Sequence, residues 1–591
     1  MQIWVNYLDQ ILIYAGLALS LNLLLGYAGQ VSVAHAAFGA IGGYTMGYLC
    51  SVHDVSFLVA ILVGTLIAFG AGVLVSLPAM KLSSEYLILL TLAVSFVVIG
   101  VFATFPQLGG TYGIIGIKDL AIFGFHMEKP SDWVIPTAVV ALVVYSICWR
   151  LGESAFGRVL KGIREDPQAT QALGKNVFAY RVAVFGVASG LAGLAGGMYS
   201  GWLGLATPSV YNFSFSLVIF AMVIFGGMAN LTGSLLGAFA VTMLEPFLRR
   251  AIKIEASRAA LVQLVVYGLA LVVLMRLRPQ GVLPEGVTLR RIVRRDKATK
   301  RLEMVGAADW VPDTKLVILG GREADHDEQE RRERRWHEAP IVLEAHGVSK
   351  AFGGIVAAAD LEIELRKGTI TALVGPNGAG KTTVFNLLTG FIPPDGGTVR
   401  LNGKELVGLS PDKVARMGLV RSFQDVRLIT RISCAENVMM AVQHQYGENM
   451  AKLFLGPTAV RKREAEVRDK AMEWLKFVGM EEFADVPAGA VSYGQSKLVS
   501  LARVLATDAE VLLLDEPASG IDTKWVDSML DIVEAVREQG RTVCIVEHNL
   551  HVVGRLADHT YFMELGRITA QGTIDELTSS PRLAEAYFGT A

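Results

Sequence analysis

Long apolar segments fill the first 280 residues, and they constrain the fold more than any other feature of the chain. Eight of them approach the roughly 20 residues that span bilayer hydrocarbon. A shorter one covers about 216–229. Because lipid cannot satisfy unpaired backbone groups, such segments are expected to be helical. The sequence therefore predicts a polytopic all-α membrane domain of eight or nine spans, at about 10–28, 33–50, 55–76, 87–105, 133–149, 182–205, 231–247 and 258–276.

Composition agrees with a membrane domain and excludes several other classes. Apolar residues make up 52% of the chain and charged residues 18%, below the roughly 25% of an average soluble domain. The net charge of −1 shows no bias toward nucleic acid, so no nucleic-acid partner is expected. The first ten residues, MQIWVNYLDQ, lack Lys and Arg, which predicts a retained first helix rather than a cleaved signal peptide. Four widely spaced cysteines are expected to be buried apolar residues rather than zinc ligands or disulfides: Cys50, Cys148, Cys434 and Cys544.

Basic residues indicate which loops face the cytoplasm. Segment 157–176 and the tail after residue 276 are both basic, so both are predicted to be cytoplasmic. Residues 290–301 hold seven basic residues and one acidic residue, which suits either an anionic membrane surface or a solvated linker. A nine-span arrangement would leave one basic cluster outside: Arg249, Arg250, Lys253 and Arg258.

A second domain begins where strand patterns start to alternate with helical patterns, from Ile341 onward. The predicted boundaries are 1–285 for the membrane domain, 286–340 for a charged cytoplasmic linker and 341–591 for a soluble α/β domain.

The stretch GYAGQVSVAHAAFGAIGGY (26–44) places Gln30, Ser32 and His35 inside an apolar segment. Polar groups within a bilayer are rare and face the protein interior or a water-filled path. The glycines and polar groups predict a closely packed, broken helix at the centre of the membrane domain. The three side chains either line a solute path or tie helices together through hydrogen bonds.

The second domain carries a phosphate-binding loop. GPNGAGKTT (375–383) fits G-x-x-x-x-G-K-[ST] and stands between an apolar strand and a helix, the context that this pattern requires. Backbone N–H groups of such a loop can wrap phosphate oxygens, while Lys381 reaches the β/γ-phosphates and the Thr382 hydroxyl can ligate Mg²⁺. The loop therefore predicts binding of a nucleotide with Mg²⁺.

Two adjacent carboxylates end the buried strand of VLLLDEP (511–517). Asp515 is predicted to hold Mg²⁺, directly or through water, and Glu516 to orient and deprotonate an attacking water. Three shorter signals accompany them: Gln424 in SFQDV, a serine-glycine turn in VSYGQSK, and His548 in IVEHN. Each is weak alone, and the prediction rests on their order and spacing in one domain.

With these motifs, residues 341–591 resemble an ATP-binding-cassette (ABC) nucleotide-binding domain. The resemblance implies ATP hydrolysis with Glu516 as general base, Gln424 as the Q-loop residue and a Mg²⁺ contact, and His548 as the switch histidine. It also implies that Phe352 stacks on adenine and that VSYGQ is the signature, although Tyr493 stands where glycine is commonest. The implied ATP-binding residues are Phe352, Gly375, Pro376, Asn377, Gly378, Ala379, Gly380, Lys381, Thr382, Thr383, Ser492, Gly494, Gln495 and the D-loop residue Asp522.

In this family the signature of one domain completes the ATP site of another. The resemblance therefore implies that Ser492 serves a partner's nucleotide and that dimerisation is part of catalysis.

Apolar residues at helical spacing within 156–166 predict a short amphipathic helix. It either docks on the ATPase near Gln424 or lies on lipid. Its apolar stripe of Phe156, Val159, Leu160 and Ile163 is opposite Arg158, Lys161 and Arg164.

Residues 1–285 resemble the permease subunit of bacterial branched-chain amino-acid uptake systems. The resemblance implies an ATP-driven importer in the bacterial inner membrane, fed by a periplasmic binding protein, with its ATPase domain in the cytoplasm. Permease and ATPase are commonly separate chains in this family, whereas here they are fused, which raises their effective concentration for each other. The matching motifs lie at 21–44, 157–176, 225–238 and 276–282, and, in the ATPase, at 491–495, 501–522 and 585–589.

The implied assembly contains two permeases and two ATPases in contact with membrane lipid. The partners are therefore a second permease and a second ATPase chain, or another copy of this chain. Urea, short amides or small aromatic acids are the alternative solutes. An exporter half-transporter would need long cytoplasmic helix extensions, which the short loops argue against; a membrane ATPase that transmits force without moving solute is the third interpretation.

Overall fold

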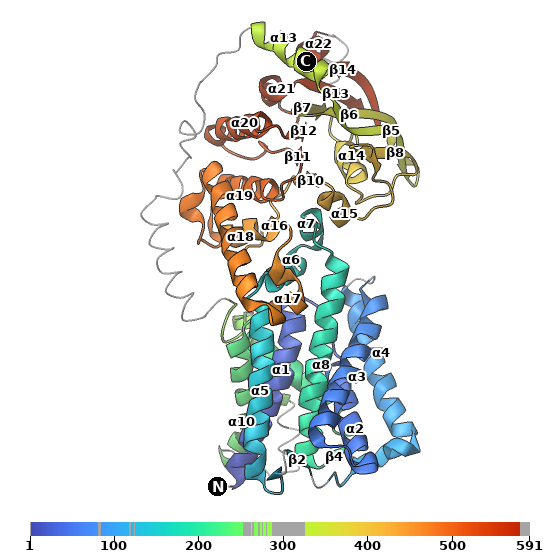
Figure 1. Ribbon diagram of the computed structural model, residues 1–591, viewed down its shortest axis with the longest axis vertical. Helices are drawn as coiled ribbons and strands as arrows, with labels where there is room; N and C mark the ends of the chain where they lie inside the picture. The colour runs from blue at the N-terminus through green and yellow to red at the C-terminus, as the bar shows by residue number, and fades with distance from the viewer. Residues whose placement is uncertain are drawn as a thin grey trace. The chain divides into compact units, whose positions relative to one another are not determined.

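The computed structural model describes residues 2–80, 84–117, 120–122 and 125–251, a discontinuous set between 262 and 285, and residues 326–579. The chain forms two compact units, which are described separately (Figure 1). The first unit comprises Met1–Glu165 and Val177–Ile292, and the second comprises Asp166–Asn176 and Val293–Ala591. Several features singled out in the sequence lie outside the described residues: Lys253, Arg258, the basic run 290–301 and the EAYFG motif.

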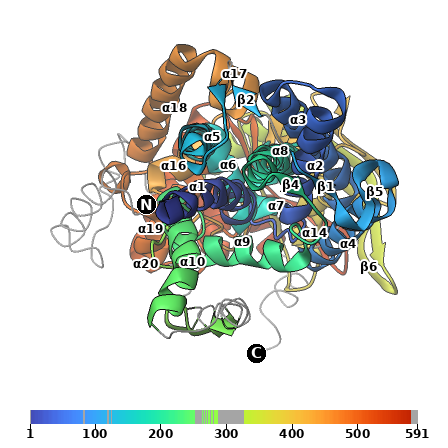
Figure 2. The same cartoon turned by 90° about the horizontal axis from the view of Figure 1, so that it is seen from below.

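Helices build the first unit, as the apolar segments predicted. The helix α8 (Val177–Leu203) packs against α1 (Gln2–Asn22), α2 (His35–His53), α3 (Phe57–Ala79) and α5 (Pro130–Gly152), and Figure 2 shows this group nearly end-on. Two short antiparallel pairs join β1 to β4 and β2 to β3. The other elements are η1 (Leu23–Tyr27), α4 (Ser84–Thr104), η2 (Pro106–Leu108), η3 (Gly110–Tyr112), β1 (Ile114–Ile115), β2 (Ala121–Ile122), β3 (Phe125–His126), α6 (Ala155–Glu165), β4 (Leu205–Ala206), α9 (Phe213–Gly226) and α10 (Leu231–Ala251).

Six helices among the described residues are long and apolar enough to cross a membrane. Two further predicted segments also form helices, α2 and the shorter α9. The last predicted segment, 258–276, lies mostly outside the described residues, so the number of spans stays a prediction. The six helices are Gln2–Tyr27, Phe57–Ala79, Glu85–Thr104, Pro130–Gly152, Val177–Leu203 and Leu231–Leu248.

The helical path is interrupted between α1 and α2. The first helix ends in a π-turn, η1, and residues 28–34 are not helical. Backbone groups at membrane depth need partners inside the protein, and α4 supplies two of them. The Val33 N–H donates to Thr91 Oγ1 at 3.2 Å, and Ser95 Oγ donates to the Val33 carbonyl at 3.1 Å. Hydroxyl side chains of a neighbouring helix therefore stabilise the break.

Glycines bring the backbones of α2 and α8 into direct contact. A Cβ atom on Gly42 would lie 2.0 Å from the Gly193 carbonyl oxygen, and one on Gly196 would lie 2.1 Å from the Gly39 oxygen. No side chain fits in these positions. Close packing of this kind replaces the hydrophobic drive that lipid cannot provide between helices.

A six-stranded sheet forms the centre of the second unit, in the order β10-β11-β12-β7-β13-β14. The first five strands run parallel and β14 pairs antiparallel with β13. Every residue of β7, β11 and β12 is buried, as expected for parallel strands covered on both faces. The strands are β7 (Ile370–Val374), β10 (Leu419–Arg421), β11 (Val511–Asp515), β12 (Thr542–Val546), β13 (His559–Glu564) and β14 (Arg567–Gly572).

A second, antiparallel sheet of four strands has the order β6-β5-β8-β9. Its strands are β5 (Ile341–Phe352), β6 (Ile355–Arg366), β8 (Gly396–Leu401) and β9 (Lys404–Glu405). The unit's helices are α7 (Pro167–Ala172), α13 (His326–Glu338), α14 (Lys381–Leu388), α15 (Pro411–Arg416), α16 (Cys434–Ala441), η5 (Tyr446–Glu448), α17 (Met450–Leu455), α18 (Pro457–Phe477), η6 (Glu481–Phe483), η7 (Ala488–Ala490), α19 (Tyr493–Leu505), α20 (Thr523–Glu538), α21 (Leu550–Leu556) and α22 (Ile574–Thr578). The predicted α/β architecture is confirmed.

The segment Asp166–Asn176, which includes α7, belongs to the second unit although it precedes α8 in the chain. We call it the docked segment. Lys175 is 3% exposed, and its ammonium lies 2.6 Å from Glu448 Oε1. The Gln443 side chain donates to the Leu173 carbonyl at 2.7 Å. A buried ion pair and a hydrogen bond thus attach the docked segment to the α/β fold.

The short helix predicted within 156–166 is confirmed as α6. It is part of the first unit, and Arg158 and Lys161 of its basic face are buried together with its apolar face. Glu285 provides the reason, because its carboxylate lies 3.6 Å from Lys161 Nζ and 2.7 Å from Arg164 Nη2. The docking of α6 on the ATPase or on lipid stays a prediction, and the docked segment follows this helix directly in the chain.

One cysteine also differs from its prediction. Cys148, Cys434 and Cys544 are buried, whereas Cys50 is only partly buried. Cys50 lies in α2 just before the exposed last turn of that helix, so its environment is less enclosed.

We expect Gly42→Ala to lower the melting temperature of the purified protein in detergent. The added methyl group would collide with the Gly193 carbonyl, and overpacking of this kind typically costs about 1–3 kcal/mol. Gly70→Ala is the matched control, since a Cβ there meets no atom within 4 Å. Equal melting temperatures for the two variants would contradict the close contact of α2 with α8.

Candidate functional site

The carboxyl ends of the parallel strands bring the sequence-predicted catalytic residues to one edge of the main sheet. The phosphate-binding loop follows β7, Gln424 follows β10, Glu516 follows β11 and His548 follows β12. Ligands of open α/β sheets bind at this edge. Strand order therefore assembles a site from segments that are far apart in the sequence.

The loop 375–380 leads from β7 into α14. Gly380 is the N-cap of α14 at φ +106°, and a Cβ there would lie 2.3 Å from the Ala357 carbonyl, so only glycine fits. The Lys381 ammonium turns back into the loop and donates to the carbonyls of Gly375 at 2.6 Å and Pro376 at 2.9 Å. Burial lowers the Lys381 pKa, and Glu516 and Asp515 oppose this by raising it. Both carboxylates therefore favour the charged form of the ammonium.

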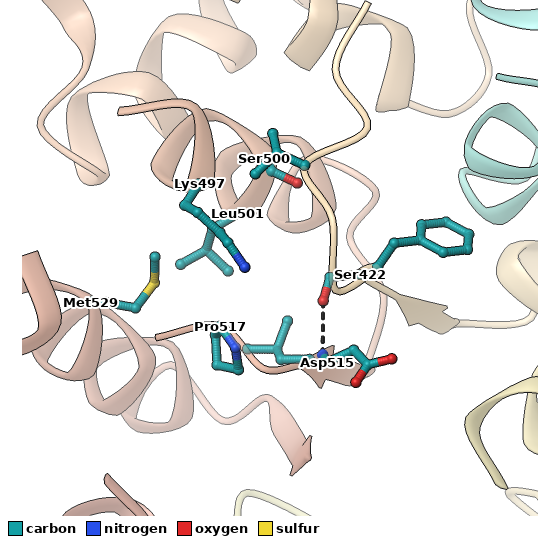
Figure 3. A pocket seen from close by; sticks show the side chains of 10 residues that line it. Ser422, Lys497, Ser500, Leu501, Asp515, Pro517 and Met529 are labelled. Atoms are coloured by element: carbon teal, nitrogen blue, oxygen red, sulfur yellow. Dashed lines mark hydrogen bonds between the residues drawn. The ribbon is translucent and has the colours of Figure 1, made fainter. Parts of the chain in front are cut away.

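Asp515 ends β11 in a buried position, 2% exposed. Arg421 Nη2 lies 3.3 Å from its Oδ2 atom, and the Asp515 N–H donates to Ser422 Oγ at 3.0 Å, as Figure 3 shows. Burial raises the pKa of Asp515, while the Arg421 guanidinium lowers it. The arginine thus favours the ionised carboxylate that metal binding requires.

Glu516 occupies a strained backbone conformation, with φ at +46°. Residues of this kind persist where surrounding structure fixes them, commonly at functional sites. Its N–H donates to the Val546 carbonyl at 2.9 Å, and its Oε2 accepts from Gln424 Nε2 at 2.9 Å. His548 Nδ1 lies 3.8 Å from the other carboxylate oxygen. The structure therefore brings Gln424, Glu516 and His548 together.

The donor groups fit Mg²⁺ with a nucleotide. Mg²⁺ prefers hard oxygen ligands and is usually held by one or two carboxylates together with phosphates. The Thr382 hydroxyl, the Gln424 amide oxygen and the Asp515 carboxylate are donors of this class. Gln424 uses its amide nitrogen for Glu516, which leaves the oxygen of the amide for a cation.

The signature residues open α19. Ser492 is its N-cap, and its hydroxyl accepts from the Gln495 N–H, while Gln495 Oε1 accepts from the Ser492 N–H at 2.8 Å. This reciprocal capping satisfies donors at a helix N-terminus, where anions bind favourably. Gly494 allows Trp525 to approach, since a Cβ on this glycine would lie 3.0 Å from the indole ring. Tyr493 is about half-exposed, at 48%.

The remaining predicted ATP-binding residues lie on other elements. Phe352 ends β5 in the antiparallel sheet and is 46% exposed, with the Lys350 ammonium 5.7 Å from its ring centroid. Asp522 is the N-cap of α20. The half-exposed ring therefore lies at the end of a strand, and its stacking on adenine stays a prediction.

Sequence reasoning missed Lys497, which is 6% exposed on α19. Its ammonium donates to the Gln424 carbonyl at 2.9 Å and to the Glu516 carbonyl at 3.1 Å. Arg421 was missed as well. Arg421 ends the short apolar strand β10, whereas Lys497 lies in a helix of mixed composition. The partners of both depend on strand order and not on nearby sequence.

In the first unit, the break between α1 and α2 holds the three predicted polar residues, all at most 4% exposed. His35 Nε2 lies 2.7 Å from Ser20 Oγ, Gln30 Nε2 contacts Met80 Sδ at 3.3 Å, and Ser32 Oγ accepts from the Ala34 N–H at 3.3 Å. The His35 and Gln30 contacts join separate helical segments, as the packing alternative expects, while the solute path stays a prediction. Within the described protein, Gln30 Oε1 and His35 Nδ1 are buried without a hydrogen-bond partner.

The phosphate loop, the strand ending in two carboxylates and the helix-capping signature define an ABC-type ATPase, here joined to a helical membrane unit. Residues 358–519 match the ABC transporter family. Residues 3–275 match the family described as branched-chain amino acid transport system / permease component.

Curated relatives resemble the ATPase part. The high-affinity branched-chain amino acid transport ATP-binding protein BraF of Pseudomonas aeruginosa is 38% identical over 252 residues, which are 42% of this chain and 98% of the relative. LivG of Escherichia coli K12, which carries the same description, is 36% identical over 251 residues, 42% of this chain and 98% of the relative. The chain belongs to the branched-chain amino acid ABC transporter family and fuses its permease and ATP-binding parts.

Among solved structures, a nucleotide-free ATP-binding cassette from an ABC transporter is 30% identical, with 42% of this chain and all of that chain covered and a TM-score of 0.38.

We expect Lys497→Met to lower kcat for ATP hydrolysis about tenfold, since the two charge-assisted hydrogen bonds that hold the Gln424 and Glu516 backbones would be lost. Phosphate release by the purified protein in lipid nanodiscs measures the rate. Lys462→Met, at an exposed position of α18, is the matched control. A wild-type rate for the Lys497 variant would show that this ammonium does not position the two residues.

Proposed function

We propose that the chain is the fused permease and ATPase of an importer that takes up branched-chain amino acids from a periplasmic binding protein. One observation carries the proposal. The same chain contains a part that matches the permease family and an ATPase part whose relatives are named as branched-chain amino acid transport proteins. In this proposal the chain lies in a bacterial inner membrane with the second unit in the cytoplasm.

ATP hydrolysis in the proposed mechanism depends on groups at the carboxyl edge of the sheet. Lys381 and the loop N–H groups would bind the phosphates. Thr382, Gln424 and Asp515 would hold Mg²⁺, which when bound would neutralise phosphate charge. Glu516 orients the attacking water and accepts its proton. Gln424 fixes the orientation of Glu516 through the 2.9 Å hydrogen bond, and His548 approaches the same carboxylate.

The docked segment supports coupling of this site to the membrane helices. It is continuous with α6 on one side and with α8 on the other, yet it is bound to the ATPase fold. Arg427, three residues after Gln424, lies 3.3 Å from Asp166 Oδ2 at the start of the segment. Movement of the Gln424 region would therefore be passed to the ends of two helices of the permease unit.

Two ATPase units are required in the proposed assembly. Ser492 and the N-terminus of α19 would bind the nucleotide held by Lys381 of a partner, and its phosphates would meet the anion-binding end of that helix. The partners are a second permease and a second ATPase subunit, or a second copy of this chain. A fused chain fixes the ratio of permease to ATPase at one to one.

Glu516→Gln is expected to retain ATP binding while losing hydrolysis by about 10²–10⁴-fold, because the amide cannot accept the water proton. Binding of a fluorescent ATP analogue and phosphate release, measured on the same preparation, separate the two effects. Glu538→Gln is the control at an exposed carboxylate of α20. A wild-type hydrolysis rate in the Glu516 variant would remove this residue from the role of base.

Uptake is tested in proteoliposomes that contain the chain and are supplied with binding proteins loaded with leucine, urea or benzoate. We expect leucine-loaded protein to stimulate ATP hydrolysis and to deliver labelled leucine to the lumen. Stimulation by urea or benzoate alone would reassign the solute within the importer class. No response to any loaded protein would favour a membrane ATPase that moves no solute.

A further inference from the structure

Residues 421–427 connect the catalytic carboxylates with the docked segment, and we call them the connecting strip. Its first residues contact the end of β11. Arg421 Nη2 lies 3.3 Å from Asp515 Oδ2. Ser422 Oγ accepts from the Asp515 N–H at 3.0 Å, the bond drawn as a dashed line in Figure 3. Gln424 bonds to Glu516. One end of the strip is therefore fixed to both carboxylate residues.

The other end of the strip is fixed to the docked segment. Arg427 Nη1 lies 3.3 Å from Asp166 Oδ2 and donates to Gln168 Oε1 at 3.1 Å. Arg503, a buried residue of α19, donates to the Arg427 carbonyl at 2.6 Å and holds its backbone. The Arg427 side chain can thus follow the docked segment while its main chain stays in place.

Phe423 lies between the two arginines in the sequence and contacts both in space. The guanidinium carbon of Arg427 lies 4.2 Å from the ring centroid and that of Arg421 lies 4.7 Å from it. Cation–π attraction depends on position over the ring and is strongest where water is excluded. A small cavity of about 20 Å³ borders Phe423, Lys497 and Asp515, which is room for about one water. Because both arginines contact this ring, a shift of the ring would change both contacts.

Burial makes the interaction between Arg421 and Asp515 sensitive to the distance between the two side chains. The side chains of Arg421 and Asp515 are 3% and 2% exposed. A charge pair shielded from water interacts far more strongly than one in water, and its energy changes steeply with separation. A small displacement of the Arg421 guanidinium would therefore change the electrostatic environment of Asp515.

We propose that Arg421, Phe423 and Arg427 form a relay through which the docked segment sets the position of the Asp515 carboxylate. The relay rests on the proposed role of Asp515 as a Mg²⁺ ligand. Its three members are positioning residues, because in this proposal they act on the site through Asp515. The affinity of the ATP site for Mg²⁺ would then depend on whether the docked segment is bound to the α/β fold.

The test measures metal affinity directly. The full-length protein in lipid nanodiscs, carrying Glu516→Gln to prevent turnover, is titrated with Mn²⁺ in the presence of ATP, and free Mn²⁺ is followed by electron paramagnetic resonance. Phe423→Leu, which removes the ring, is expected to weaken Mn²⁺ binding about tenfold. Phe423→Tyr keeps the ring and is expected to stay within about twofold of the parent.

Asp166→Asn breaks the ion pair with Arg427 while keeping a side chain that can cap α7. We expect it to weaken Mn²⁺ binding as well, and the Asp166→Asn, Phe423→Leu double variant to be no worse than Phe423→Leu alone, because both act along one path. Asp485→Asn breaks an exposed ion pair with Arg468 on the same unit and is expected to leave Mn²⁺ affinity unchanged.

Additive effects of Asp166→Asn and Phe423→Leu, or unchanged Mn²⁺ affinity in both, would overturn the relay. Asp515→Asn distinguishes the relay from the function on which it rests. If Asp515→Asn weakens Mn²⁺ binding and the relay variants do not, Asp515 is a metal ligand and the relay is wrong. If Asp515→Asn has no effect on Mn²⁺ binding, Asp515 is not a metal ligand, and the relay is wrong as well.

Discussion

The parallel pairing of β11, β12 and β7 is the constraint on which the catalytic edge depends. Asp515 is paired with Val546, and Val546 with Leu373, so the three strands end at the same level. The residues that follow each strand must therefore emerge side by side. A shift of one strand by a residue would turn its side chains to the opposite face and separate Glu516 from its partners.

The membrane unit meets a different constraint, because a broken helix there must find partners for its backbone. The break at 28–34 finds them in hydroxyl groups of α4, and it needs glycine where neighbours come close. At Gly29, with φ at +67°, a Cβ would lie 2.7 Å from Arg164 Cγ. The break is thus packed against α6 as well as against α4. Because α6 leads into the docked segment, the polar residues around the break lie close to the helix that precedes that segment.

Local motifs were predictable from the sequence, and contacts across the fold were not. The phosphate loop, the paired acids at 515–516 and the serine-glycine turn at 492–494 each depend on a few neighbouring residues, so their local structure followed from residue type. The Arg421–Asp515 pair depends on β10 lying beside β11, and no nearby residue signals that order. The amphipathic helix at 156–166 was predictable from its spacing, but the partner of its basic residues was not. Glu285, which pairs with Lys161 and Arg164, lies more than a hundred residues away in the sequence.

The docked segment makes the second unit discontinuous in sequence. During synthesis, residues 166–176 and the helices around them are made before β5 and the rest of the α/β fold. The ATPase unit can therefore complete its surface only on a piece of chain already anchored between membrane helices. The ion pair between Lys175 and Glu448 can form only after the later part of the chain has folded around residues 166–176. Formation of this ion pair would therefore mark the completion of the second unit.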